Sequence, residues 1–177
     1  MKAFQLHNAR VNPDIRAFHA KPEDTAAIQE LLVQTARWLK SRGSLQWGGL
    51  LAGIDSHDTA GSILRGNVFV CKEGDTLAGM MMLLPEPSEW DRQLWGEEGH
   101  EGAIYLHRLA INRDYAGRGL GRDMMQWAEQ GIRFPGKDRI RLDCIADNPA
   151  LNDFYTRIGY EFMGQAPGGF NTFEKKL

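Results

Sequence analysis

The feature of this sequence that most constrains its fold is a glycine-rich turn, YAGRGLGRDM at 115–124, between an apolar run and an amphipathic segment. The apolar run AIYLHRLAI at 103–111 has the composition of a strand, and 120–132 has the apolar period of a helix. A strand that turns directly into a helix gathers backbone N–H groups and the positive end of the helix dipole at one point. The turn therefore predicts a sheet with helices packed on it and an anion-binding point where the helix starts.

Further strands and helices are predicted on both sides of this turn. Strands are expected at 15–19, in two runs of 67–84 that the turn Glu73-Gly74-Asp75 joins as a hairpin, at 103–111, at 139–146, at 160–163 and at 171–175. Helices are expected from Pro22 to Gly43, at 59–64, at 120–132 and from Asn148 to Gly159, and 85–102 is predicted to be a long loop of functional or mobile type. We expect an α/β (α+β) fold: a mixed, mostly antiparallel central sheet of six to seven strands flanked by helices, in a single domain over 1–177.

Composition argues against several classes of partner. The chain has 21 Lys and Arg against 23 Asp and Glu, so it has no global basic field to attract a nucleic acid. Its apolar stretches fall well short of the ~20 residues that a membrane-spanning helix needs, and the N-terminus does not resemble a signal peptide, so we expect a cytoplasmic protein. Cys71 and Cys144 lie in apolar segments without metal-ligand spacing, so we expect buried free thiols and no metal site.

The glycines of the turn favour a phosphate as the bound anion. Side chains at Gly119 and Gly121 would hold a pyrophosphate away from the backbone, and Arg118 and Arg122 can add charge-assisted contacts. The turn lacks the Gly-Lys-Ser/Thr ending of a P-loop, and a dinucleotide-binding turn has its glycines earlier. By pattern alone, a nucleotide-like ligand and a plain helix-start turn remain equally compatible with the sequence.

The wider context resembles a known family. LHRLAINRDYAGRGLGRDMMQWAE at 106–129, followed by IRLDCIADNPALNDFYTRIGYEFMG at 140–164, is similar to the acetyl-CoA-binding core of the GCN5-related N-acetyltransferase family, over about 103–164. The family's turn is Gln/Arg-x-x-Gly-x-Gly/Ala, and AGRGLG matches it at Gly119 and Gly121 but has Ala116 at the first position. This departure matters little if backbone amides hold the pyrophosphate, as in the family.

The resemblance implies an acetyl-CoA site. The strand over LAI would splay from its neighbour and present backbone groups to the pantetheine arm, Asn148 would contact the cofactor, and Tyr155 would lie beside its sulfur. The cofactor-binding residues so implied are Leu109, Ala110, Ile111, Ala116, Gly117, Arg118, Gly119, Leu120, Gly121, Arg122, Asn148 and Tyr155.

Transfer of an acetyl group to an amine needs a base for the amine and a proton for the departing thiolate. We assign the general acid to Tyr155, seven residues past Asn148 on one helix, although a tyrosine that only packs the helix on the sheet is the alternative. The candidate base is His107, which resembles a histidine of the arylalkylamine branch of the family; a structural histidine is an equally strong alternative. Strand alternation puts His107 and Arg108 on opposite faces unless a bulge intervenes.

Other residues are weaker candidates. Glu97, Glu98, His100 and Glu101 offer further bases, but a charge run in a loop is usually solvated surface. Trp47, Trp90 and Trp95 could line a pocket for a cationic amine, or simply cover the edge of the core. Cys144 has no adjacent base in sequence, so direct attack by the amine is the better mechanism.

The sequence therefore predicts an acetyl-CoA-dependent N-acetyltransferase that acts on the primary amine of a small molecule in a ternary complex, with a homodimer as a possible assembly. Two alternatives remain open. The first is a non-catalytic acyl-CoA or nucleotide-binding module, and the second is a protein or peptide N-acetyltransferase with an open groove.

Overall fold

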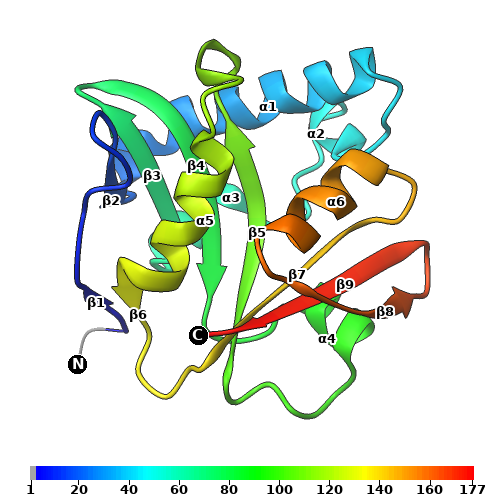
Figure 1. Ribbon diagram of the computed structural model, residues 1–177. Coiled ribbons are helices and arrows are strands. Elements are labelled where there is room, and N and C mark those ends of the chain that lie inside the picture. The colour runs from blue at the N-terminus through cyan, green and yellow to red at the C-terminus, as the bar shows by residue number, and fades with distance from the viewer. Residues whose placement is uncertain (1–2) are drawn as a thin grey trace. The chain divides into compact units, whose positions relative to one another are not determined.

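The computed structural model describes residues 3–177 (Figure 1). Its strands are β1 (Gln5–Leu6), β2 (Arg16–His19), β3 (Val68–Glu73), β4 (Thr76–Leu84), β5 (Ala103–Ile111), β6 (Ile132–Arg133), β7 (Arg139–Ile145), β8 (Glu161–Ala166) and β9 (Phe170–Lys176). Its helices are α1 (Thr25–Ser41), α2 (Gly48–Leu51), α3 (Thr59–Leu64), α4 (Glu89–Trp95), α5 (Leu120–Gln130) and α6 (Pro149–Arg157), with 3-10 turns η1 (Pro22–Asp24) and η2 (Arg113–Tyr115). Within 3–177, every helix is too short or too polar to cross a membrane.

The strands form a seven-stranded sheet in the order β2-β3-β4-β5-β7-β9-β8, and β1 pairs with β6 separately. The β5–β7 pair is parallel, whereas β2–β3, β3–β4, β7–β9 and β8–β9 are antiparallel. The predicted fold class, a mixed and mostly antiparallel sheet flanked by helices, is confirmed. The described residues divide into two compact units, and the single-domain interpretation stays a prediction.

One unit consists of 8–82 and 108–131, and the β3–β4 hairpin is its centre. Figure 1 shows that α5 runs across this hairpin. The centroid of the Phe69 ring of β3 lies 5.7 Å from the centroid of the Trp127 ring of α5. Gly79 of β4 lies directly under Met124 of α5. The apolar side chains of β3 and most of those of β4 are almost fully buried, so the helix packs on a continuous apolar face.

The other unit consists of residues up to His7, 83–107 and 132–177. Its helices cover opposite faces of the β7–β9–β8 ladder. The Tyr155 ring of α6 contacts Phe173, whereas the Trp90 ring of α4 meets Phe170, three residues earlier on β9. Because side chains alternate along a strand, residues at odd spacing point to opposite faces. Arg141 and Asp143 of β7 therefore lie on the α4 face, and Leu142 and Cys144 lie on the α6 face.

The prediction of a long loop at 85–102 is wrong in its middle, because α4 forms there. Ser88 caps α4: its hydroxyl accepts the Asp91 N–H at 3.2 Å, and the Asp91 carboxylate accepts the Ser88 N–H at 2.8 Å. The helix is only seven residues long, too short to show an apolar period. The helix predicted at 120–132 also ends earlier, since Gly131 terminates it and Ile132 enters β6.

We predict that Gly79→Val lowers the free energy of unfolding by about 1–3 kcal/mol, the usual range for overpacking. A Cβ at this position would lie 2.7 Å from the Met124 sulfur and 3.0 Å from the Ala110 carbonyl oxygen, and the latter is backbone that cannot move aside. Urea unfolding followed by circular dichroism measures the loss.

Gly74→Asn is the matched control. Gly74 has φ +58 and open space where a Cβ would be, and asparagine tolerates this conformation better than other residues. Equal losses in the two variants would mean that the tight contact at Gly79 is not the cause.

Candidate active site

The glycine turn follows the pattern expected from the sequence. Asn112 accepts the Asp114 N–H at 3.0 Å and so starts η2 directly after β5. Gly117 and Gly119 then have φ +75 and +73, a left-handed conformation that glycine adopts without strain. Gly119 is the N-cap of α5, so glycine is needed there for the backbone itself as well as for access. Residues 116–122, all predicted to bind the cofactor, lie together in this turn and the first helical residues.

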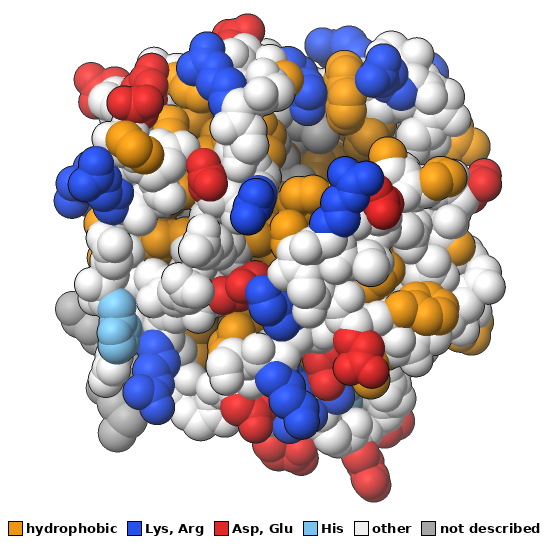
Figure 2. Space-filling view, viewed as in Figure 1, with side chains coloured by type: hydrophobic (Ala, Val, Ile, Leu, Met, Phe, Trp, Pro, Cys, Tyr) orange, Lys and Arg blue, Asp and Glu red, His pale blue; other side chains and the backbone are white. Residues whose placement is uncertain are grey.

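The start of α5 offers unused backbone donors. The Asp123 N–H donates to the Gly119 carbonyl at 3.1 Å, so the N–H groups of Leu120, Gly121 and Arg122 precede the first helical hydrogen bond. The Arg118 guanidinium lies over the Tyr115 ring, 5.0 Å from its centroid, in the same turn. Figure 2 shows Lys and Arg side chains on the surface near the start of α5. This combination of amides, dipole and cations suits a phosphate.

The backbone of β5 is interrupted at Arg108, which has φ +56. A left-handed residue departs from the regular strand backbone, so simple alternation does not decide the side on which Arg108 lies relative to His107. The register of β5 with β7 covers Ala103–Tyr105 opposite Arg139–Arg141. His107 and Asp143 come two residues later on the two strands, on the face that α4 covers.

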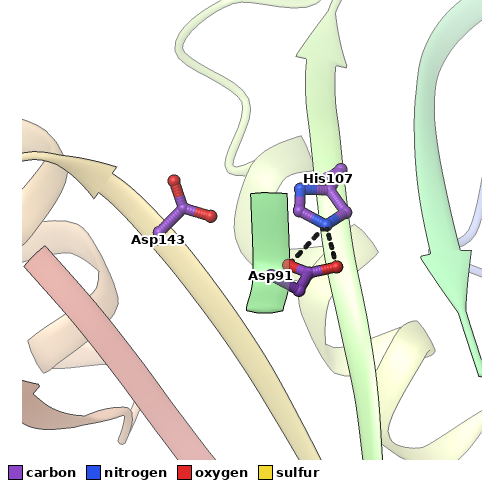
Figure 3. A group of neighbouring side chains, drawn as sticks. All are labelled: Asp91, His107 and Asp143. Carbon is purple, nitrogen blue, oxygen red and sulfur yellow. Dashed lines mark hydrogen bonds and ion pairs between the residues drawn. The ribbon is translucent and has the colours of Figure 1, made fainter. Parts of the chain in front are cut away.

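His107 is held by a buried carboxylate. Its Nε2 lies 2.9 Å from Asp91 Oδ1 and 3.0 Å from Oδ2, and the two side chains are only 5% and 1% exposed (Figure 3). Burial on its own would raise the pKa of Asp91, but the hydrogen bond and charge of His107 and the bonds from Ser88 outweigh it and lower that pKa. An ionised carboxylate only accepts hydrogen bonds, so the Nε2 of His107 carries the proton between them.

Asp143 lies across from this pair on β7 (Figure 3). The Trp90 Nε1–H of α4 donates to its Oδ2 at 3.2 Å. Burial raises the pKa of Asp143, only partly offset by the charge of His107 and the Trp90 bond, and the Asp91 charge adds to the rise. One ligand atom from each of Asp91, His107 and Asp143 lies within 4.8 Å of the others, a spacing that can hold a metal ion. The absence of a metal site stays a prediction.

Tyr155 and Asn148 both come from α6. Asn148 is the N-cap, and its Oδ1 accepts the Leu151 N–H at 3.1 Å. Tyr155 is buried, with its ring against Tyr160 and Phe173. Burial raises the pKa of the Tyr155 phenol, and the charges of Cys144 and Asp143 add to the effect, so the phenol stays protonated at neutral pH.

The weaker candidates are engaged elsewhere or exposed. His100 is hydrogen-bonded to the Tyr105 hydroxyl and, through Nε2 at 2.7 Å, to the Gly96 carbonyl, which is a structural role. Glu97, Glu98 and Glu101 are exposed. Burial raises the pKa of the Cys144 thiol to about 12, so it is a poor nucleophile.

Each of the three tryptophans that the sequence suggested for an amine pocket contacts another side chain of its own unit. The Arg108 guanidinium lies over the Trp47 ring at 5.2 Å, and that of Arg141 lies over the Trp95 ring at 4.4 Å. Two of the three tryptophan rings that were considered for a cationic amine therefore already stack against an arginine side chain of the protein. Trp90 donates its indole N–H to Asp143, as described above.

Sequence reasoning missed Asp91 and Asp143, the two carboxylates beside His107. The Ser88-x-x-Asp91 spacing is a capping signal that could have located α4, and the alternation in RIRLDCIA could have placed Asp143 on one face. The pairing of Asp91 with His107, sixteen residues away in sequence, has no local signal.

We predict that Asp91→Asn lowers the free energy of unfolding by about 1.5–3 kcal/mol at pH 7, because it removes the buried carboxylate that accepts the His107 Nε2–H and the Ser88 N–H. The folded-state pKa of Asp91 lies below its unfolded value, so this contribution is present above about pH 4 and is lost as the pH falls through the folded pKa. Urea unfolding at about pH 7, 4 and 2.5 measures it.

Asp143→Asn is the matched variant, and its expected effect on the free energy of unfolding at pH 7 has the opposite sign. The folded-state pKa of Asp143 lies above its unfolded value, so its ionised form destabilises the fold at neutral pH. This variant should equal or exceed the wild type in stability at pH 7 and lose the gain towards pH 4. Equal destabilisation of both variants at pH 7 would contradict the assigned charge states.

Comparisons with known proteins agree with this geometry. The model of the acetyltransferase (GNAT) family matches residues 36–160. A protein of Bacillus subtilis (strain 168) named uncharacterized N-acetyltransferase YesJ is 56% identical over 177 residues, which is 100% of this chain and 98% of the relative.

Solved structures share the fold. A GNAT-family acetyltransferase from Listeria monocytogenes 4b F2365 superposes with a TM-score of 0.77 at 36% identity, over 92% of this chain and 95% of that one. The PaiA N-acetyltransferase from Thermoplasma acidophilum, solved in complex with coenzyme A, has a TM-score of 0.68 at 17% identity, over 92% of this chain and 99% of that one. The second likeness concerns the fold alone.

Proposed function

The chain belongs to the acetyltransferase (GNAT) family and is an N-acetyltransferase, and from this premise we propose that it transfers an acetyl group from acetyl-CoA to the primary amine of a small molecule. The amine nitrogen attacks the thioester carbon directly in a ternary complex. The C–N bond forms, the C–S bond breaks, the amine loses a proton and the departing thiolate gains one.

The observation that carries the proposal is the glycine turn at the start of α5. Residues 116–119 are exposed, and the donors of Leu120, Gly121 and Arg122 lack helical partners. These amides and the helix dipole bind the pyrophosphate of the cofactor, with Arg118 and Arg122 at its sides. Leu109–Ile111 of β5 offer backbone groups to the pantetheine arm, and Asn148 offers an amide.

His107 is the proposed general base. Its Nε2–H faces the ionised Asp91, so we propose that Nδ1 is the atom that takes the proton from the amine, directly or through water. Asp91 holds the ring in this tautomer and orientation and stabilises the imidazolium that forms, as a buried carboxylate does beside other catalytic histidines.

Tyr155 is the proposed general acid. It comes from the α6 face and His107 from the α4 face, and the register of β5 with β7 ends at Tyr105 and Arg141, so we propose that the reacting groups meet between the two strands beyond that point. Its raised pKa keeps the proton on the phenol until a thiolate forms nearby, and burial removes water that would compete for that thiolate. The high pKa of Cys144 further supports direct attack by the amine over an acetylated cysteine.

A small acceptor is favoured over a protein because the proposed base is deeply buried. With the His107 side chain 5% exposed, an acceptor must enter the protein to reach it. Calorimetric titration with acetyl-CoA, followed by free-thiol release with panels of small amines and short peptides, tests the proposal. Release with peptides alone would favour a protein acceptor, and binding without any release would favour a binding module.

We predict that Gly121→Glu weakens acetyl-CoA binding at least about 100-fold, because a carboxylate would occupy the place of the pyrophosphate. Gly121 lies inside α5, where an acidic residue in the first turn suits the dipole, so the melting temperature should not fall. Calorimetry and thermal melts give the two values.

Gln126→Glu adds the same charge to the exposed side of α5, away from the turn, and should bind acetyl-CoA like the wild type. Unchanged affinity in Gly121→Glu would exclude the turn as the cofactor site.

We predict that Tyr155→Phe lowers kcat by about 10²- to 10⁴-fold, the usual contribution of a general acid, with little change in acetyl-CoA affinity. Stopped-flow thiol release and calorimetry separate the two effects. Tyr160→Phe, in the same aromatic cluster, is the matched control and should retain kcat. Full activity in Tyr155→Phe would leave Tyr155 with a packing role only.

A further inference from the structure

A buried arginine in the unit that comprises 8–82 and 108–131 has hydrogen-bond donors without acceptors. Arg108 is 7% exposed, and within the described chain its Nε and Nη1 have no hydrogen-bond partner. Its Nη2 makes only long contacts, 3.4 Å to the Ser56 hydroxyl and 3.6 Å to Asp55 Oδ1. Buried polar groups are nearly always paired, so two unpaired donors on one buried cation indicate a missing acceptor.

The neighbouring groups hold Arg108 but do not satisfy it. The Trp47 ring lies 5.2 Å from the guanidinium and covers it without accepting a conventional hydrogen bond. The Asp55 carboxylate already accepts the N–H groups of His57 at 3.2 Å and Thr59 at 2.8 Å. Burial lowers the pKa of Arg108, and Asp55 offsets this only in part.

The backbone around this arginine is strained. Arg108 has φ +56 and Trp47 has φ +61, and within 3–177 only three residues other than glycine have positive φ. The third, Asp58, has a local reason, since its side chain caps α3 by accepting the Gly61 N–H. Two stacked residues that both adopt a left-handed conformation without such a cap are typical of a functional site.

The free edge of the guanidinium selects the chemistry of its partner. The N–H of Nε lies parallel to one N–H of Nη2, whose own contacts are long, and this side-on fork matches the two oxygens of a carboxylate. The unpartnered Nη1 can donate to a further oxygen. Asp55 offsets part of the positive charge, so a monoanion suits the site better than a doubly charged phosphate.

We propose that Arg108 binds a carboxylate group of the acceptor, so that the enzyme acetylates the amine of an amino acid or a similar amino-carboxylic compound. This inference rests on the proposed function in one respect, namely that the compound bound at Arg108 is the acetyl acceptor. The carboxylate site itself rests on Arg108, Trp47 and Asp55. Neutral or purely cationic amines would leave the Arg108 donors unpaired and bind more weakly.

The first experiment compares matched acceptors. Each amino acid is assayed beside its amide and its decarboxylated amine, with the wild type, Arg108→Met and Arg108→Lys. We expect the wild type to prefer the carboxylate by roughly 10- to 100-fold in kcat/KM, the range for a charged hydrogen bond. Arg108→Met should lower kcat/KM far more on the amino acids than on their amides, so that the preference disappears, and Arg108→Lys should keep part of the preference.

Arg42→Met is the matched control, because Arg42 also stacks on a tryptophan, Trp38 at 5.5 Å, but is exposed. It should keep the wild-type preference. An equal loss in Arg108→Met on acceptors with and without a carboxylate would overturn the proposal, since Arg108 would then act on the reaction or the fold. Equal wild-type rates on all three acceptor types would also overturn it.

The second experiment detects binding without catalysis. The ¹⁵Nε–¹Hε signal of Arg108, identified by its loss in Arg108→Met, is followed during titration of the wild type with sodium acetate, acetamide and inorganic phosphate. We expect a saturable shift with acetate and none with acetamide. No shift with acetate, or a shift with phosphate alone, would overturn the carboxylate assignment.

The two experiments separate the two proposals. If no amine is acetylated but acetate moves the Arg108 signal, the proposed function fails and the carboxylate site stands. If amines are acetylated but acetate leaves the signal unchanged, the function stands and the carboxylate site fails.

Discussion

The hydrogen bond between His107 and the buried Asp91 carboxylate is the interaction on which the candidate site depends. Asp91 is at once the third residue of α4, a partner of the Ser88 cap and the acceptor for His107, so one carboxylate ties the start of the helix to β5. Its neighbours on α4 extend the attachment to β7, because Trp90 donates to Asp143 and Trp95 stacks on Arg141. The orientation of the proposed base therefore follows from the position of a seven-residue helix.

Much of the fold could be predicted because its signals are local. The apolar period of α1 and α5, the Glu73-Gly74-Asp75 turn and the strand composition of β5 and β7 each lie within a few residues, and the structure agrees with them. The helix that was not predicted, α4, is too short to show an apolar period. Its third residue is Asp91, where the commoner capping box has glutamate or glutamine. Two-residue strands such as β1 exist only through their partner, so sequence alone does not locate them.

The candidate site was less predictable, because its parts depend on contacts between distant segments. Gly117 and Gly119 carry their own signal, since glycine is the residue that adopts their backbone conformation without strain. His107 and Tyr155 were identified by resemblance, and their roles stay predictions. Nothing in the sequence near Arg108 indicates that its donors lack acceptors, because that property depends on how residues 47–56 pack around it.

The order of strands in the second unit has a consequence for synthesis of the chain. β9 follows β8 in sequence but lies between β7 and β8 in the sheet, with backbone pairing on both sides. When a ribosome has produced β7, α6 and β8 but not yet β9, β7 and β8 have no common partner, and each presents an unpaired edge. This part of the protein cannot fold segment by segment as it emerges: it waits for a strand that arrives after both of the neighbours it joins.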